Sequence, residues 1–204
     1  MHRARTVAPI YLGQLPLTPI EFAAVDTARE HGRAAGLVIA DAALGNSLTT
    51  RPALEAAVAQ RRGWPGVGAA GWVVDFADSR AESPLESISR LGMHNENLPR
   101  PEPQVEIWLD GRFVGRADFY WDEPGVVGEA DGWDKYGNDW RKFRDQKRKD
   151  EQYTRAGLVV VRWDWQEAGE FAGVAARIRD AFGPGAAQPH DSRRCIPRRC
   201  GLRE

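Results

Sequence analysis

The chain has 204 residues, 42% of them hydrophobic, which is enough for one good core or for a small helical domain beside a mixed one. No run approaches the roughly 18 apolar residues of a membrane span, and the start lacks the apolar core of a signal peptide, so we expect a soluble, cytoplasmic protein without membrane contact. A net charge of −1 and a pI near 6.5 are atypical of a nucleic-acid binder until the charges are considered by position.

Residues 18–77 carry a helical pattern. Thr18 followed by Pro19 is typical of a helix start, and apolar residues then recur among many alanines. Two further helices are predicted from Pro52 to Gln60 and from about Val67 to Phe76, with a turn between them. We therefore predict a small all-helical domain over residues 1–80, without visible chemistry.

The glycines at positions 66, 68 and 71 match the G-x-G-x-x-G spacing of dinucleotide-binding proteins. That motif requires a strand before its first glycine, whereas the residues before Gly66 are polar, helical in pattern and end in Pro65. We therefore interpret the spacing as coincidental.

The pattern changes after residue 80, and we assign residues 81–182 to an α/β domain. Ser83 and Pro84 are typical of a helix start, and this helix is predicted to end near Gly92. Strands and helices then follow in the order β-β-β-α-β-α, with a hairpin turn at Asp110 and Gly111. The predicted elements are strands at 104–109, 112–120 and 125–131, a helix at 139–156, a strand at 158–163 and a helix at 166–182.

Residues 183–204 are rich in glycine, proline, alanine and paired arginines, which predicts a disordered basic tail. The chain's two cysteines, Cys195 and Cys200, lie in this tail, where they cannot staple the body of the fold. A structural zinc needs more ligands than this pair and His190 provide, so we interpret both as free thiols.

The charges of the α/β domain are segregated along the chain. From Asp118 to Asp134 there are six acids and no Lys or Arg, whereas Asp139 to Asp150 holds six bases and three acids. Because strand side chains alternate between faces, Glu129 and Asp131 are expected to point the same way, and Asp118 is expected to lie beside Glu129 on the neighbouring strand. Two or three carboxylates are thus predicted to converge.

Such a cluster favours a bound cation, because carboxylates at short range raise one another's pKa unless a positive charge neutralises them. Mg²⁺ and Mn²⁺ take oxygen ligands, bind through one or two carboxylates and accept a substrate phosphate in the same shell. We therefore predict a metal site at Asp118, Glu129 and Asp131. The alternative is a solvated acidic loop, since Asp131 followed by Gly132 is also a common turn dipeptide.

Asp118, ten intervening residues and Glu129, within the predicted αβββαβ order, resemble the PD-(D/E)XK nuclease superfamily. More closely, the chain is similar to the branch related to very-short-patch-repair endonucleases through the segments SPLES, PEPQVEI, GRFVGRADFYW, GEADGWDKYG and KRKDEQYTRAGLVVVRWDW. The resemblance implies a restriction-endonuclease-like core. It also implies a link to actinobacterial proteins in which a similar helical segment precedes this domain, and which are often associated with abortive-infection antitoxins. Those relatives usually carry a winged-helix region further upstream, which we expect this chain to lack.

The resemblance also implies roles for individual residues. The two acids of the motif would be metal ligands, and Glu86 would correspond to the acid that orients a metal-bound water. Where the superfamily has a lysine, this chain has Asp131, so we take Lys135 as the first candidate for the missing positive charge and Lys147 as the second. The alternatives are that Glu86 is an ordinary acid of a helix first turn and Lys135 an exposed loop residue.

The basic helix that follows the acidic cluster is a candidate DNA-binding surface. Its side chains would contact phosphates without reading the base sequence, and binding would depend on salt. The alternative is a solvated helix face with ion pairs between successive turns. The candidate residues are Arg141, Lys142, Arg144, Lys147 and Arg148.

These observations predict a Mg²⁺-dependent DNA endonuclease that hydrolyses phosphodiester bonds through metal-activated water. The expected partners are DNA and a toxin or antitoxin protein. The alternative is a nuclease-like fold that has lost catalysis, as Asp131 suggests, and that acts as a DNA- or protein-binding antitoxin or regulator component.

Overall fold

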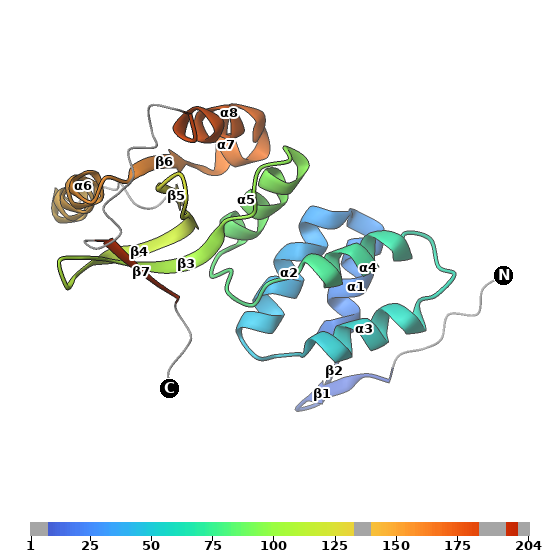
Figure 1. The fold of residues 1–204 in the computed structure, drawn as a ribbon. Helices are drawn as coiled ribbons and strands as arrows, with labels where there is room; N and C mark the ends of the chain where they lie inside the picture. The colour runs from blue at the N-terminus through green and yellow to red at the C-terminus, as the bar shows by residue number, and fades with distance from the viewer. Residues whose placement is uncertain (1–7, 133–139, 184–194, 200–204) are drawn as a thin grey trace. The chain divides into compact units, whose positions relative to one another are not determined.

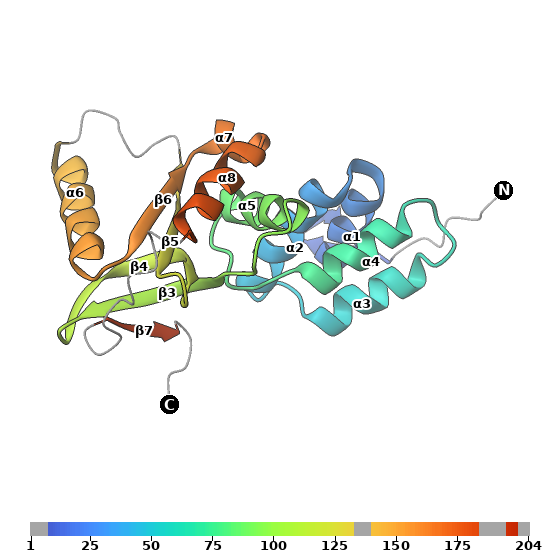
Figure 2. The ribbon, with the colours of Figure 1, turned by 45° about the horizontal axis from the view of Figure 1, so that its top comes forward.

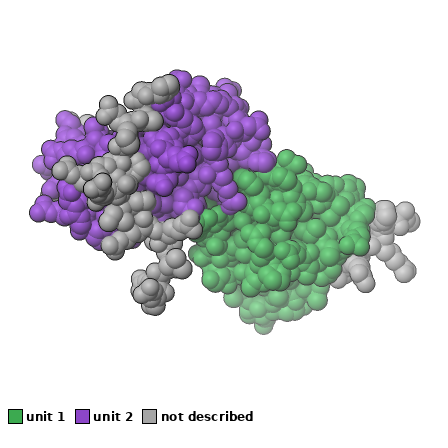
Figure 3. Space-filling model, viewed as in Figure 1, with its two compact units in different colours: residues 1–87 green, residues 88–204 purple. Residues whose placement is uncertain are grey.

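The computed structural model describes residues 8–132, 140–183 and 195–199 of the chain. Over these residues the protein is mixed α/β and forms two compact units, Met1–Ser87 and Ile88–Glu204 (Figure 3). The sequence predicted the boundary at residue 80, before the helix Pro84–Asn95, whereas in the structure the boundary falls within that helix.

Between residue 8 and the start of α5, the first unit contains four helices and a short β-hairpin. Its helices bury many alanines and a few larger side chains, such as Leu37, Leu54 and Val73, each at most 1% exposed. This shared apolar interior stabilises helices that would be marginal in isolation. The elements are β1 (Ile10–Leu12), β2 (Leu15–Leu17), α1 (Ile20–His31), α2 (Arg33–Gly45), α3 (Arg51–Gln60) and α4 (Val67–Phe76).

The hairpin makes the prediction of an all-helical first domain wrong. β1 and β2 pair antiparallel, with Ile10 opposite Leu17, and the chain turns at Gly13, whose φ of 63° suits a glycine. Pro16 lies within β2, and a proline lacks the N–H that a strand donates, so this strand has a weak signal in the sequence.

The glycine-rich segment before α4 has the conformation of a turn. Gly66 is the N-cap of α4 with a φ of 77°, and a Cβ added to it would lie 2.3 Å from the Arg29 carbonyl oxygen. Residues 61–66 form turns and a bend rather than a strand. The strand required by a dinucleotide-binding motif is therefore missing, and the interpretation of the spacing as coincidental is confirmed.

The second unit is built on a five-stranded sheet in the order β6-β5-β4-β3-β7. β3, β4 and β5 form an antiparallel meander, and β6 joins parallel to β5 after a helix. This αβββαβ order of elements is the one predicted from the sequence, with the last predicted helix divided into two. The elements are α5 (Pro84–Asn95, which begins in the first unit), β3 (Glu102–Leu109), β4 (Arg112–Trp121), β5 (Val126–Ala130), α6 (Trp140–Arg155), β6 (Val159–Trp163), α7 (Trp165–Gly169), α8 (Ala172–Ala181) and β7 (Cys195–Arg199).

Helices cover both faces of this sheet (Figures 1 and 2). On one face α6 packs Tyr153 into an apolar cluster with Val127 and its neighbours. On the other face Trp163 of β6 stacks on Phe119 and meets Phe171, which precedes α8, edge to face. Within the described ranges, no helix combines the length and the apolar character that a membrane crossing would require.

Part of the segment predicted to be a disordered tail is a strand. β7 pairs antiparallel with β3, with Val105 opposite Arg199 and Leu109 opposite Cys195. The outer edge of β3 presents backbone N–H and C=O groups that a further strand can satisfy, and an edge position tolerates Pro197. The prediction of a flexible tail is therefore wrong for residues 195–199.

Candidate functional site

Asp118 and Glu129 are neighbours across two strands. β4 and β5 pair with Phe119 opposite Gly128, so the next position in the same register places Asp118 opposite Glu129. The Oδ2 atom of Asp118 accepts a hydrogen bond of 2.9 Å from the backbone N–H of Ala130, which holds this carboxylate against β5. The predicted side-by-side arrangement of these two acids is confirmed.

Lys149 of α6 contacts Glu129 of this acidic pair. Its Nζ atom donates to Oε1 of Glu129 at 2.8 Å and to the carbonyl oxygen of Arg116 at 3.0 Å. Tyr153, one helical turn further along α6, donates its hydroxyl to the same Oε1 atom at 3.3 Å. Helix α6 therefore supplies two donors to a carboxylate that is only 3% exposed.

The electrostatics of Glu129 reflect its burial. Removal from water raises the pKa of the Glu129 carboxyl, the Lys149 ammonium opposes this rise, and the neighbouring Asp118 charge adds to it, so that the pKa lies above its ordinary value. Burial, with the adjacent Glu129, likewise raises the pKa of the Tyr153 hydroxyl, so Tyr153 acts as a hydrogen-bond donor. Additional positive charge beside Glu129 would stabilise its ionised form.

Gly115 makes room for the lysine. A Cβ at this position of β4 would lie 2.7 Å from Cε of Lys149 and 3.2 Å from the hydroxyl oxygen of Tyr153. Real Cβ atoms do not approach other atoms as closely as 2.7 Å. The absence of a side chain at Gly115 is therefore what lets Lys149 lie across the sheet toward Glu129.

Asp131, the third predicted metal ligand, is engaged by an arginine. Its Oδ2 atom accepts from Nη1 of Arg162 at 3.0 Å, and Nη2 of Arg162 donates to Asp150 at 2.6 Å. Although burial opposes the charge of Arg162, the bond to Asp131 and the nearby Glu129 raise its pKa above the ordinary value. Among the described residues, no group of three or more Asp, Glu, His or Cys side chains is arranged to hold a metal ion by itself.

Glu86, predicted to orient a metal-bound water, takes part in a helix cap. Its Oε1 atom accepts from the Ser83 hydroxyl at 2.8 Å, and its Oε2 atom accepts from the backbone N–H of Glu82 at 2.9 Å. The backbone N–H of Glu86 donates back to Ser83 at 3.2 Å. Glu86 thus serves as an acid of the first turn of α5, which is the alternative that the sequence left open.

The remaining predicted residues belong to the segment after β5. Lys135 lies outside the described residues. Lys147, Arg144 and Arg148 of α6 are all exposed, as a surface for phosphates requires, whereas the side chains of Arg141 and Lys142 lie outside what the structure describes. Among the described lysines of α6, Lys147 is exposed and Lys149 contacts Glu129.

The inward position of Lys149 has a signal in the sequence. Tyr153 and Ala156 are buried, so they mark the inward face of α6, and Lys149 lies four residues before Tyr153 on that same face. Arg162 could have been found in the same way, because the parallel register pairs it with Glu129 on the adjacent strand.

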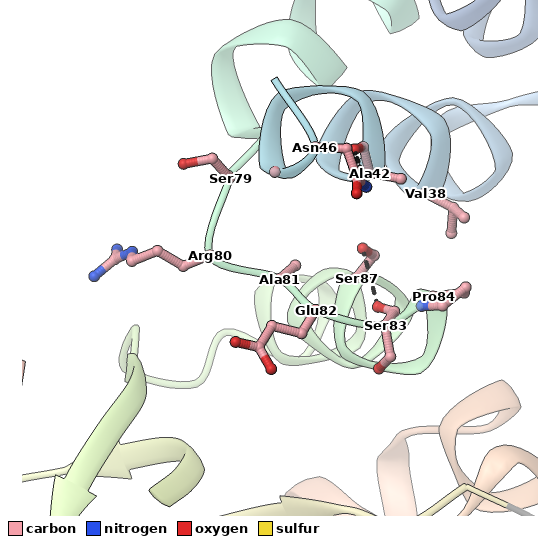
Figure 4. A pocket seen from close by; sticks show the side chains of 11 residues that line it. Val38, Ala42, Asn46, Ser79, Arg80, Ala81, Glu82, Ser83, Pro84 and Ser87 are labelled. Carbon is pink, nitrogen blue, oxygen red and sulfur yellow. Dashed lines mark hydrogen bonds between the residues drawn. The ribbon is translucent and has the colours of Figure 1, made fainter. Parts of the chain in front are cut away.

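The first unit contains a separate pocket of about 310 Å³ between α2 and the start of α5 (Figure 4). Two of its polar side chains are engaged with other protein groups: Ser87 donates to Asp41 at 2.7 Å, and Arg80 donates to Asp78 at 2.9 Å. The pocket wall otherwise includes small residues such as Ala42. This arrangement indicates no particular chemistry.

Two relatives from Mycobacterium tuberculosis share part of this sequence. The chain is 37% identical over 136 residues to the uncharacterized protein Rv2248 of strain H37Rv, and equally to the uncharacterized protein MT2308 of strain CDC 1551. The aligned part is 67% of this chain and 50% of each relative, so the chain spans about half the length of the curated relatives it matches. No protein-family model matches the chain, and no solved structure matches it.

Proposed function

We propose that the second unit is a restriction-endonuclease-like domain that hydrolyses phosphodiester bonds of DNA in the cytoplasm with the help of a divalent cation. The strand connections support this proposal, because the meander β3-β4-β5, the helix α6 and the parallel strand β6 follow the αβββαβ order of the superfamily that the sequence resembles. A fold alone does not define an activity, so the proposal depends on the side chains.

The observation that carries the proposal is the grouping of two acids and a lysine. Asp118 and Glu129 lie opposite each other on neighbouring strands, and Lys149 contacts Glu129 at 2.8 Å. Catalysis of phosphoryl transfer depends on positioning and on positive charge around the phosphate, and it needs little covalent participation from the protein. Two carboxylates with an adjacent ammonium provide the minimal parts for this task.

The donor set fits Mg²⁺ or Mn²⁺ bound by Asp118 and Glu129. These ions bind through one or two carboxylates and complete their shell with water and substrate phosphate, so a group of three protein ligands is not required. When bound, such an ion polarises the phosphoryl oxygen and lowers the pKa of a water molecule toward neutrality. Asp131, held by Arg162, is better suited to orienting that arginine than to binding the ion.

Other residues of the unit would act on the substrate directly. The Lys149 ammonium, held at the acidic pair by the Arg116 carbonyl oxygen, would stabilise negative charge that develops on the phosphate. It takes the role that the superfamily assigns to a lysine on the strand, where this chain has Asp131. The exposed Arg144, Lys147 and Arg148 would hold the DNA backbone beside the site.

Nicking of supercoiled plasmid tests the proposal. We expect nicking with Mg²⁺ or Mn²⁺, and we expect chelation of the ion to abolish it. Asp118→Asn and Lys149→Met should also abolish nicking. The control Glu123→Gln, which changes an exposed acid in the turn after β4, should retain it. If the wild-type protein is folded and leaves the plasmid intact with every divalent ion tried, the enzymatic proposal is wrong.

A second candidate is a nuclease-like domain that binds DNA or a toxin or antitoxin partner without cleavage. The Asp131–Arg162 pair favours it, because an acid stands where the superfamily has its lysine. Calorimetric titration with Mn²⁺ separates the two candidates. Only the hydrolase requires the protein to bind an ion, and Asp118→Asn should abolish that binding. Retained DNA binding without metal binding would select the second candidate.

The DNA surface can be tested independently of catalysis. Each phosphate contact contributes to the salt dependence of binding, so removing one of these charges should weaken binding for all sequences and lower the slope of log K against log salt by about 1. We expect this for Arg144→Ala, Lys147→Ala and Arg148→Ala. An unchanged slope in all three variants would place the DNA elsewhere.

A further inference from the structure

Gln104 has an unusual backbone conformation for its position. Among the described residues, the non-glycine residues with positive φ are Ser47, Asn97, Gln104 and Asp110. The other three lie in turns, whereas Gln104, with a φ of 56°, lies inside strand β3 and is 3% exposed. A residue with a side chain pays a steric penalty in this left-handed region, so the surrounding structure must impose it.

The sheet changes faces at Gln104. Val105 and its partner Ala117 belong to the apolar cluster with Tyr153 on the α6 face. Two residues away, Phe119, the partner of Pro103, stacks on Trp163. A Cβ at Gly128 would also contact Phe119 and Trp163, which places them on the opposite face from Val127.

In a regular strand, residues two apart share a face, so both β3 and β4 break their alternation between these pairs. The break lies at the two residues between them, Gln104 and Asp118, which occupy facing positions in the register of β3 and β4. The left-handed backbone at Gln104 provides the change of direction that β3 needs there. The same device, an irregular residue that redirects a neighbouring side chain, is common next to active sites.

The face change decides where Asp118 points. Tyr120 and Val127 pair with each other and belong to the α6-face cluster, so Asp118, two residues before Tyr120, shares a face with Glu129, two residues after Val127. If β4 instead continued the alternation set by Ala117, Asp118 would point toward Trp163. The acidic pair therefore exists only because the strands change faces at this point.

We propose that Gln104 is a positioning residue of the acidic pair, and that its left-handed backbone turns the Asp118 carboxylate to the face that holds Glu129 and Lys149. The consequence for metal binding rests on the proposed function, whereas the geometry does not. Glycine reaches the left-handed region without penalty and a β-branched residue hardly enters it, so Gln104→Gly and Gln104→Val separate the backbone conformation from the side chain.

Cross-linking measures this geometry without any assay of activity. Asp118→Cys and Glu129→Cys are combined in a chain with Cys195→Ser and Cys200→Ser and treated with dibromobimane, which fluoresces on bridging two nearby thiols. Facing residues on one side of an antiparallel pair have Cβ atoms about 5 Å apart, within reach of this reagent. We expect bridging with Gln104 and with Gln104→Gly, and loss of bridging in Gln104→Val.

Mn²⁺ titration of the same Gln104 variants, with Asp118 and Glu129 intact, supplies the second measurement. We expect Gln104→Gly to bind like the wild type and Gln104→Val to lose binding; if the valine variant does not fold, Gln104→Thr, which is also β-branched, replaces it in both assays. Unchanged bridging in a folded valine or threonine variant, or lost bridging in Gln104→Gly, overturns the proposal. If bridging follows the expected pattern but neither the wild type nor any variant binds Mn²⁺, the positioning role of Gln104 is supported and only the proposed metal site is refuted.

Discussion

Replacing Lys149 by methionine tests whether the second unit depends on the contact between α6 and the acidic pair. The substitution keeps a long apolar side chain and removes the ammonium that bonds Glu129 and the Arg116 carbonyl oxygen. The Glu129 side chain is 4% exposed and that of Lys149 is 23% exposed, so the pair is mostly buried. Breaking a buried pair by removing one partner costs roughly 3–5 kcal/mol, and the partial exposure of Lys149 places the expected cost at the lower end, about 3 kcal/mol.

The loss of stability caused by Lys149→Met should depend on pH, because Glu129 titrates. Its pKa in the folded protein is already raised above 4.5, chiefly by burial, and loss of Lys149 removes the group that opposes this rise. A carboxyl whose pKa is higher in the folded state contributes stability below the pKa of the unfolded chain and loses it as pH rises through the folded value. The difference between wild type and Lys149→Met should therefore be small near pH 4.5 and grow toward pH 7.5.

Hydrogen exchange of the β4 and β5 amides measures this cost within the second unit. Lys147→Met, an exposed lysine of the same helix, is the matched control and should change stability by no more than about 0.5 kcal/mol. If Lys149→Met costs no more than the control at pH 7.5, or costs the same at both pH values, the reasoning about the buried pair is refuted.

Two further predictions concern single contacts. Gly115→Ala should displace Lys149 from Glu129, because its Cβ would lie 2.7 Å from Cε of that lysine, and should destabilise the unit by about 1–3 kcal/mol. Gly132→Ala, which has open space at its Cβ, is the control and should not destabilise the unit. Equal thermal unfolding midpoints for the two variants would contradict this prediction. In the first unit, the bond from Arg61 holds the pKa of Asp26 below its ordinary value, so this pair stabilises the fold at neutral pH and the stability is lost as pH falls through the folded pKa. Asp26→Asn should therefore lower the unfolding midpoint at pH 7 more than at pH 3, and an equal loss at both pH values would contradict the assignment.

The sequence predicted the elements of the second unit well because their signals are local. The Asp110-Gly111 turn, the serine and proline at the start of α5 and the apolar run of β6 each depend on a few adjacent residues. The pairing of Asp118 with Glu129 was also accessible, since strand alternation and an adjacent antiparallel strand are enough to infer it.

The sequence analysis did not single out Lys149, because its contact depends on packing between distant segments. Lys135, the first candidate, lies outside the described residues, and Lys147, the second, is exposed. Lys149 contacts Glu129 because Tyr153 fixes the inward face of α6 and Gly115 leaves space on β4. The left-handed backbone of Gln104 had no sequence signal, since glutamine is not a residue that favours that conformation.

Charge balance bears on which of the two proposed functions this site serves. Three of its carboxylates, those of Glu129, Asp131 and Asp150, are bonded to two cations, Lys149 and Arg162, and a fourth, that of Asp118, is held by the backbone N–H of Ala130. When all are ionised, two negative charges remain among these described groups, which is the charge that one divalent ion neutralises. A DNA phosphate adds further negative charge, so it is repelled from the acidic pair unless such an ion accompanies it. The proposed DNA-binding alternative relies on the exposed bases of α6 and gives the buried Glu129 no part in phosphate contact, whereas the proposed hydrolase uses that acid to bring the ion and the phosphate to the same place.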